Sequence, residues 1–363
     1  MASNTIPLHG GQLSEIAERF SVPKESLLDF SASISPIPPG DAVIAALCES
    51  LRNRDLLTQY PDTEYRDLKD AIGTYAGLDR SSICVANGVM PLLDAAVRAL
   101  RLRRCLVLAP AFGEYQRILT ACGADSPKLL LREDNNFLLD PDLIVKEVMS
   151  SRADAILFAN PHSPSGSLTL PSVLIELQRM LYRSGIVTIL DEAFIDYCPE
   201  CSISGLAGHL DGLVVLRSLT KFFAIPGLRV AYAVACDETC TTMESRLPLW
   251  PVDSLAASAA RLVLLDRDGR RERQEINSRE RHWLFEQLSS LGWQVFPGNA
   301  NYLLIKPPGK IDGQEIWRRL IVKHRIVVRN CGTFDGLTDG HFRIAVRDHL
   351  SNQTLTSSLA HLF

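Results

Sequence analysis

The chain has 363 residues, of which 46% are hydrophobic and 22% are charged, and its formal net charge at pH 7 is −4. This length predicts about two domains, and the composition is typical of a globular protein rather than a disordered or fibrous one. The slightly acidic balance argues against nucleic acid as a partner, because nucleic-acid-binding domains usually carry a basic excess.

The N-terminal sequence and the apolar runs indicate where the protein works. The first residues lack a charged region followed by an apolar one, and no apolar run reaches the roughly 20 residues that a membrane span requires. We therefore expect a cytoplasmic protein that binds small molecules and does not bind a membrane.

Nine cysteines are present, and two pairs of them are closely spaced. Cys198 and Cys201 form a C-x-x-C pair, and Cys236 and Cys240 form a C-x-x-x-C pair. Four thiolates are a common zinc ligand set, but neither pair has the glycine and basic neighbours of a zinc knuckle. We therefore expect reduced thiols and no metal.

Four short runs, rich in β-branched residues or leucine, predict buried strands. They cover residues 104–110, 154–161, 185–193 and 212–221. A stretch with the apolar spacing of a helix, residues 170–185, lies between two of them. This alternation predicts βα units around a mostly parallel sheet.

Polar and turn-forming residues follow each of these runs. They include Phe112, residues 160–166, Asp191 and residues 218–221. In an open α/β sheet the ligand crevice lies at the carboxyl ends of the strands, so we expect these residues to meet at one edge of the sheet.

The sequence changes character after about residue 247. A charged, helix-rich segment, an apolar run and a strand-like run follow one another at residues 267–292, 293–308 and 340–348. This order predicts a smaller α+β domain. We expect a large domain over residues 39–246, and a small domain over residues 247–363 that packs with the N-terminal segment 1–38.

Asp191 and Lys221 each come at the end of a predicted strand. A buried carboxylate needs a partner, and a partly desolvated lysine is the more nucleophilic kind that forms Schiff bases. A pyridinium ring satisfies both, since its aldehyde carbon condenses with the lysine and the carboxylate keeps its nitrogen protonated. Ser218, Thr220 and Arg229 then suit the phosphate of such a ring. The alternative is an ordinary structural ion pair between Asp191 and Lys221.

Five stretches of the chain, in their order and spacing, resemble the fold-type-I pyridoxal-phosphate enzymes of the histidinol-phosphate aminotransferase branch. They are "ANGVM", "PAFGEY", "NPHSPSG", "DEAFIDY" and "SLTKFFAIPGLR". Within that branch the chain is most similar to the L-threonine-O-3-phosphate decarboxylases of cobalamin biosynthesis. That similarity is carried by "HGG", "LLDFSASISP", "QYPDTEY", "NANYLL" and "FRIAVR".

The resemblance implies an α/β protein with the aspartate-aminotransferase-like fold type I, in which helices flank a mostly parallel sheet and a smaller α+β domain follows. It also implies pyridoxal 5′-phosphate as cofactor and a phosphorylated amino acid as substrate. Decarboxylation would give an aminoalkyl phosphate for the cobamide nucleotide loop. In this family Lys221 would carry the cofactor and move protons, Asp191 would hold the pyridine nitrogen, and Phe112 would stack on the ring.

The remaining roles come from the same resemblance. The other cofactor-binding positions are Gly88, Val89, Met90, Ser163, Ser218, Thr220 and Arg229, with Tyr60 reaching in from a second subunit of a homodimer. The substrate-binding positions are His9, Gly10, Ser33, Asn301, Arg329, Arg343 and Arg347. Arg343 and Arg347 lie four residues apart, so in a strand they would share a face and could hold one ligand.

Three places depart from the family pattern. Ser163, preceded by His162, stands where the family has an asparagine that bonds the ring hydroxyl oxygen. In the phosphate loop, the family's polar side chains are replaced by Val89, Met90 and Pro91. Binding of the cofactor phosphate there then depends on backbone amides. The third is "SIS" at Ser33 to Ser35, where the decarboxylases commonly have "NIN".

Three functions are compatible with a pyridoxal-phosphate site in this sequence. Pyridoxal phosphate breaks the bond held perpendicular to its ring, and the choice between decarboxylation and transamination depends on geometry that the sequence does not give. A decarboxylase is our first prediction, and a histidinol-phosphate-type aminotransferase that uses 2-oxoglutarate is the alternative. A non-enzymatic sensor of pyridoxal phosphate is disfavoured, because the sequence has no basic DNA-binding segment at its N-terminus.

Overall fold

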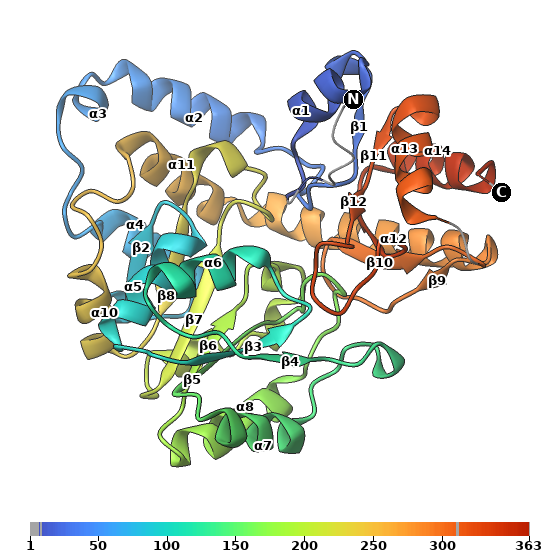
Figure 1. Ribbon diagram of the computed structural model, residues 1–363. Coiled ribbons are helices and arrows are strands. Elements are labelled where there is room, and N and C mark those ends of the chain that lie inside the picture. Colours follow the sequence, from blue (N-terminus) through green and yellow to red (C-terminus); the bar gives the residue numbers. More distant parts are fainter. Residues whose placement is uncertain (1–6, 8, 310–311, 363) are drawn as a thin grey trace.

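The computed structural model describes residues 7, 9–309 and 312–362. The chain forms a seven-stranded sheet and a four-stranded sheet. Figure 1 shows helices on both faces of the larger sheet and the smaller part beside it. The predicted pairing of a mostly parallel α/β sheet with a smaller α+β part is confirmed.

Seven strands make up the large sheet. In spatial order they are β2 (Ile83–Ala86), β8 (Ala231–Val234), β7 (Leu213–Ser218), β6 (Val187–Asp191), β5 (Ala155–Ala159), β3 (Cys105–Ala109) and β4 (Lys128–Leu130). Strand β8 runs antiparallel to both of its neighbours, and the other pairs are parallel. The four strands predicted from the sequence are β3, β5, β6 and β7.

Two layers of helices bury the large sheet. The helices of this part are α2 (Asp41–Arg52), α3 (Asp55–Thr58), α4 (Arg66–Ala76), α5 (Val89–Ala99), α6 (Gly113–Ala121), α7 (Pro141–Ser151), α8 (Pro171–Arg183), α9 (Ser204–Ala207), α10 (Asp237–Glu244) and α11 (Ser254–Leu265). Apolar residues of α4, α7, α8 and α11 pack on one face, and those of α5, α6 and α10 pack on the other. Because both faces are covered, every residue of β2, β3 and β7 is buried.

Side chains alternate between these two faces along each strand. On β6 Leu190 packs with the α4 layer and Ile189 with the α5 layer, and on β7 Val215 and Leu216 divide in the same way. This alternation decides the surroundings of the residues at the strand ends.

The smaller part contains the C-terminal elements and the N-terminal segment. Its elements are α1 (Leu13–Phe20), β1 (Leu28–Asp29), α12 (Arg267–Ser290), β9 (Gln294–Val295), β10 (Tyr302–Lys306), α13 (Gly313–His324), β11 (Ile326–Val327), β12 (Arg329–Asn330), β13 (Phe342–Ala345) and α14 (His349–Ala360). The four-stranded sheet is antiparallel in the order β12-β13-β10-β9, and β1 pairs in parallel with β11. The N-terminal segment therefore shares a core with the C-terminal part, which unites Ile16 and Phe30 with Leu288 and Ile344.

Short 3₁₀ helices join several elements. They are η1 (Lys24–Ser26), η2 (Arg80–Ser82), η3 (Glu133–Asn135), η4 (Ile195–Tyr197), η5 (Pro199–Cys201) and η6 (Pro226–Leu228). Helix α11, which follows residue 247, packs in the core of the large sheet. The domain boundary at residues 246 and 247 stays a prediction. Among the described helices, none combines the length and the apolar character needed to cross a membrane.

Candidate active site

Lys221 lies in the loop after β7, with its amine largely buried. Burial lowers the pKa of this amine to about 8, the charges of Arg343 and Arg229 act in the same direction, and Asp191 opposes them. A lysine with an ordinary pKa is almost wholly protonated near neutral pH, whereas this one loses its proton under mild conditions. The site therefore provides an amine that can act as a nucleophile.

Asp191 ends β6 on the sheet face that α5 and α6 cover. Its Oδ2 accepts a hydrogen bond from the Tyr115 hydroxyl at 2.5 Å, and its Oδ1 accepts one from the Ala193 N–H at 2.8 Å. Burial raises the pKa of Asp191, while these two hydrogen bonds and Lys221 counteract the rise. The carboxylate is fixed in orientation, and no described residue forms a bidentate ion pair with it, so it suits a protonated ring nitrogen.

Tyr115 was not among the residues predicted from the sequence. It lies in the first turn of α6, three residues after Phe112, and its ring packs edge-on against Phe112 with 5.8 Å between the centroids. The three-residue spacing in "PAFGEY" was the available signal, because helical residues three apart share a face.

A second group of residues forms what we call the phosphate cup: Gly88, Val89, Met90, Ser218, Thr220 and Arg229. Helix α5 begins at Val89, and no side chain within the described part of the chain caps its N-terminus, so its first backbone N–H groups can bind an anion. A Cβ added to Gly88 would lie 3.1 Å from Nη2 of Arg229, so the guanidinium lies directly against this glycine. The hydroxyls of Ser218 and Thr220 are 2.8 Å apart.

Gly88 has a conformation that side chains rarely adopt, with φ of 124° and ψ of 168°. Glycine is required at this point both for the backbone and for the close approach of Arg229. The cup joins a guanidinium, a helix N-terminus and two hydroxyls, which is the donor set for a phosphate. With Lys221 and Asp191 nearby, the residues present fit pyridoxal phosphate.

Arg343, on β13, joins the site from the smaller part. Its Nη1 donates to Oγ of Ser163 at 3.3 Å, its Nη2 donates to the carbonyl of Ser31 at 3.5 Å, and its guanidinium lies 5.0 Å from the ring centroid of Tyr302. Its buried Nε has no hydrogen-bond partner among the described residues. Because both nitrogen contacts are long and the third is absent, this guanidinium can still bind an anion.

The buried His162 has a structural setting. Its Nε2 donates to the carbonyl of Pro110 at 2.9 Å, its Nδ1 lies 2.7 Å from Oγ of Ser165, and its own carbonyl accepts from the Tyr302 hydroxyl at 2.9 Å. Burial lowers the pKa of His162 to about 4. The imidazole is therefore neutral at physiological pH and helps to hold the loop that carries Ser163.

Two other candidate substrate residues have unused polar atoms. Asn301 is fully buried, and neither polar atom of its side chain has a partner among the described residues. The same holds for the hydroxyl of Ser33. The segment around Ser33 touches the site, since the N–H of Ser35 donates to the carbonyl of Lys221 at 3.0 Å.

Arg329 is engaged by its own neighbours. It donates to the carbonyls of Pro7 and Asn330 and to the hydroxyl of Thr333, at 2.6 to 2.8 Å. Burial lowers the pKa of Arg329 to about 10. As described, this guanidinium organises the chain around it.

The N-terminal candidates contact Phe112, Glu114 and Ser31. The His9 ring packs 5.6 Å from that of Phe112, and its Nε2 lies 3.3 Å from a carboxylate oxygen of Glu114. A Cβ added to Gly10 would lie 2.1 Å from the carbonyl oxygen of Ser31, so only glycine allows this close packing.

The last two candidates are Arg347 and Tyr60. Strand β13 ends at Ala345, and Arg347 lies beyond it, where its N–H donates to Asn352 at 3.1 Å. The expectation that Arg343 and Arg347 share a strand face is therefore wrong, because the strand ends between them. Tyr60 is 79% exposed, and its ring stacks on Trp250 at 4.2 Å. All nine cysteines are free thiols.

Comparison with known proteins identifies relatives along the whole chain. The family described as aminotransferase class I and II matches residues 25–362. Threonine-phosphate decarboxylase of Salmonella typhimurium is 32% identical over 354 residues, which cover 97% of this chain and 95% of the relative.

Solved structures agree with the fold. The histidinol-phosphate aminotransferase of Clostridium acetobutylicum superposes with a TM-score of 0.85 at 28% identity, covering 92% of this chain and 98% of the other. The Sinorhizobium meliloti histidinol-phosphate aminotransferase, solved in complex with pyridoxal-5′-phosphate, also gives 0.85, at 18% identity and with 98% and 95% covered.

These matches confirm three predictions made from the sequence: the resemblance, the aspartate-aminotransferase-like fold type I and the cofactor. The chain belongs to the aminotransferase class I and II family and is a pyridoxal-phosphate-dependent enzyme.

Proposed function

We propose that the enzyme decarboxylates L-threonine-O-3-phosphate, or a similarly phosphorylated amino acid, to an aminoalkyl phosphate for the cobamide nucleotide loop. The observation that carries the proposal is the 32% identity to the Salmonella typhimurium decarboxylase over nearly all of both chains. Such a substrate has a carboxylate and a phosphate and so needs fixed cationic donors. A cytoplasmic location belongs to the same proposal.

The proposed division of labour begins with the cofactor. The phosphate cup would hold its phosphate, Phe112 would cover the ring, and Asp191 would accept a hydrogen bond from the ring nitrogen. When bound, pyridoxal phosphate supplies a ring that withdraws electrons from the bond that breaks at the substrate α carbon. Tyr115 and the Ala193 N–H keep the Asp191 carboxylate oriented for this contact.

Lys221 is the proposed proton carrier. Its pKa of about 8 gives the amine comparable populations of both protonation states at mildly alkaline pH. The nearby positive charges of Arg343 and Arg229, which depress this pKa, are the same charges that would bind anionic groups. One electrostatic arrangement therefore serves both tasks.

Arg343 is the proposed ligand of the substrate carboxylate. Its unpartnered Nε and its long contacts leave donor capacity beside Ser163. Asn301, Ser33 and His9 are the proposed polar neighbours of the rest of the substrate. How Arg343 orients the carboxylate relative to the ring would select decarboxylation over proton removal.

The alternative is a histidinol-phosphate-type aminotransferase. It is favoured by the 28% identity and the TM-score of 0.85 to the Clostridium acetobutylicum enzyme of that name. Both reactions use the same lysine, carboxylate and phosphate cup, so those residues do not discriminate between them.

Product analysis distinguishes the two. Holoenzyme is incubated with L-threonine-O-3-phosphate, and separately with histidinol phosphate and 2-oxoglutarate. Carbon dioxide from the first mixture and no glutamate from the second is the expected result. Glutamate formation from the second mixture without carbon dioxide from the first would overturn the proposal, and Lys221→Ala is the control for uncatalysed reaction.

We propose in addition that the enzyme is a homodimer with shared active sites. Tyr60 stacks with Trp250 among exposed apolar side chains that include Leu57, which is 68% exposed, and Leu249, which is 74% exposed. A surface patch of this kind is typical of a protein interface. Tyr60 would then extend to the phosphate cup of the second subunit.

A further inference from the structure

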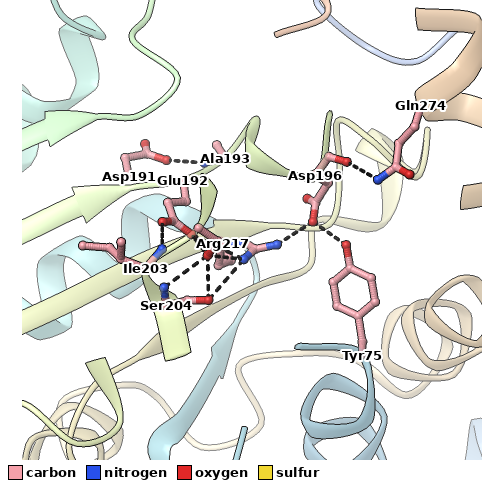
Figure 2. Close-up of polar contacts among 10 residues, drawn as sticks. Tyr75, Asp191, Glu192, Ala193, Asp196, Ile203, Ser204, Arg217 and Gln274 are labelled. Atoms are coloured by element: carbon pink, nitrogen blue, oxygen red, sulfur yellow. Dashed lines mark hydrogen bonds and ion pairs between the residues drawn. The ribbon is translucent and has the colours of Figure 1, made fainter. Parts of the chain in front are cut away.

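Arg217 forms a buried charged cluster on the sheet face opposite to Asp191. Figure 2 shows its guanidinium between the carboxylates of Glu192 and Asp196, with the Tyr75 hydroxyl on the far side of Asp196. Arg217, Glu192 and Asp196 are each at least 96% buried as side chains. We call Arg217, Glu192, Asp196 and Tyr75 the Arg217 cluster.

The hydrogen bonds of the cluster are directional. Nη2 of Arg217 donates to Asp196 Oδ1 at 2.5 Å, and Nη1 lies 3.4 Å from Glu192 Oε2. Glu192 also accepts from the Ser202 hydroxyl at 2.6 Å and from the Ile203 N–H at 3.0 Å. These contacts fix the path of the backbone in the segment that follows β6.

The position of the cluster follows from the strand alternation. Glu192 follows Asp191 directly and Arg217 precedes Ser218, so the cluster and the cofactor residues point to opposite faces at the same two strand ends. The backbone hydrogen bonds between β6 and β7 end close to these residues, since β6 stops at Asp191 and β7 at Ser218. Beyond Asp191, the N–H of Glu192 makes one further bond, to the Leu216 carbonyl at 2.8 Å.

Beyond the last backbone hydrogen bond, the side-chain contacts of the Arg217 cluster hold the two strand ends together. The cluster joins the first residue after β6 to the penultimate residue of β7, four positions before Lys221. It also reaches the smaller part, because the carbonyl of Asp196 accepts from Gln274 of α12 at 2.9 Å. A buried ion pair contributes little to stability compared with apolar packing, so its value here is the geometry that it fixes.

We propose that Arg217 is a positioning residue, which holds the ends of β6 and β7 together from the far face and so sets the separation of Asp191 and Lys221. The inference rests on the proposed roles of these two residues toward pyridoxal phosphate, and it is independent of the substrate. It predicts an effect on cofactor binding from a side chain that does not contact the cofactor.

The test compares Arg217→Met with Lys69→Met. Lys69 is a buried cation as well, and it pairs with Glu244 of α10 at 2.5 Å rather than with a member of the cluster. Each apoprotein is titrated with pyridoxal phosphate, and the visible absorbance of the bound cofactor is recorded against concentration and against pH. Thermal unfolding of each apoprotein is measured in parallel.

We expect both variants to lose thermal stability, and Arg217→Met alone to bind the cofactor at least about tenfold more weakly, with a shifted pH midpoint of the absorbance band. Arg217→Lys, which keeps the charge but bonds one carboxylate less well, should recover part of the affinity. An affinity within about twofold of wild type and an unchanged midpoint in Arg217→Met would overturn the inference.

Arg217→Met leaves two buried carboxylates without their cationic partner, and this variant could misfold for that reason. A second variant, which removes one of the negative charges instead, tests the inference independently. Glu192→Gln keeps the shape and the Ile203 contact and removes one charge from the cluster. A weaker affinity and a shifted midpoint are expected in this variant too, and wild-type values in it would overturn the inference. If wild-type protein itself takes up no pyridoxal phosphate, the proposed function fails first, and the inference fails with it.

Discussion

Arg343 has more donor capacity than its neighbours in the chain use. If it binds the substrate carboxylate, Arg343→Met removes charged hydrogen bonds worth about 1.5 to 3 kcal/mol each, or roughly ten- to a hundredfold or more in kcat/KM. Arg347→Met is the control, since Arg347 lies beyond the end of β13. Steady-state kinetics with L-threonine-O-3-phosphate measures both variants. A kcat/KM of Arg343→Met within about twofold of wild type would favour the aminotransferase.

The lowered pKa of Lys221 predicts a pH dependence. The neutral amine reacts with the cofactor, and its fraction rises with pH until the pKa of about 8 is passed. The rate of cofactor uptake by apoprotein should therefore fall about tenfold per pH unit below that value. Because Arg343 depresses this pKa, Arg343→Met should move the midpoint to higher pH. Stopped-flow absorbance measures both midpoints, and an unmoved midpoint would show that the two charges do not interact.

Tyr115 is a residue of the site that was not predicted from the sequence, although it lies within "PAFGEY". Tyr115→Phe removes the hydroxyl that donates to Asp191, which should raise the pKa of Asp191 further and weaken cofactor binding by about ten- to a hundredfold. Tyr65→Phe is the matched control, because its buried hydroxyl bonds Val252 elsewhere in the core. Absorbance titration of both apoproteins gives the dissociation constants. Equal affinities in the two variants would contradict a role for Tyr115 toward Asp191.

At the scale of single elements, the start of α5 depends on Gly88. Gly88→Ala combines an unfavourable φ of 124° with a Cβ close to Arg229, and strain of this kind costs on the order of 1 to 3 kcal/mol. We expect a lower melting temperature and weaker cofactor binding. Gly40→Ala changes the glycine before α2, which has a φ of −63° and no atom within 4 Å of an added Cβ. It should leave both quantities nearly unchanged, and similar losses in the two variants would refute the argument.

Secondary-structure elements and the residues at strand ends were predicted from the sequence more successfully than contacts between side chains. Runs of β-branched residues identified β3, β5, β6 and β7, because a strand buried on both faces must be apolar throughout. Strands of two residues, such as β1 and β11, leave no periodic pattern to detect. Asp191 and Lys221 were found because strand ends are recognisable. The side chains bonded to Arg217 belong to Glu192, Asp196, Ser202 and Ser204, in the connection that follows β6, and only tertiary packing brings them to Arg217.

At the scale of the whole molecule, shared sites make a prediction about mixed subunits. If Tyr60 serves the neighbouring site, Tyr60→Phe in one subunit and Lys221→Ala in the other both fall in the same site of a heterodimer and leave the second site whole. Mixing the two inactive variants should restore one intact site per heterodimer and recover activity above either parent. Sedimentation at the assay concentration provides the control. A monomer there, or no recovery after subunit exchange, would rule out this arrangement.

The pairing of β1 with β11 has a consequence for biosynthesis. Leu28 and Ile326 are register partners, so the two strands meet only after nearly the entire chain has left the ribosome. The seven strands of the large sheet all precede residue 235, and their contacts can form earlier. Closing so long a segment is entropically costly and slow. During translation the apolar side chains of the N-terminal segment therefore stay exposed to solvent and accessible to chaperones. They are buried only when the C-terminal part has been synthesised and packs on them.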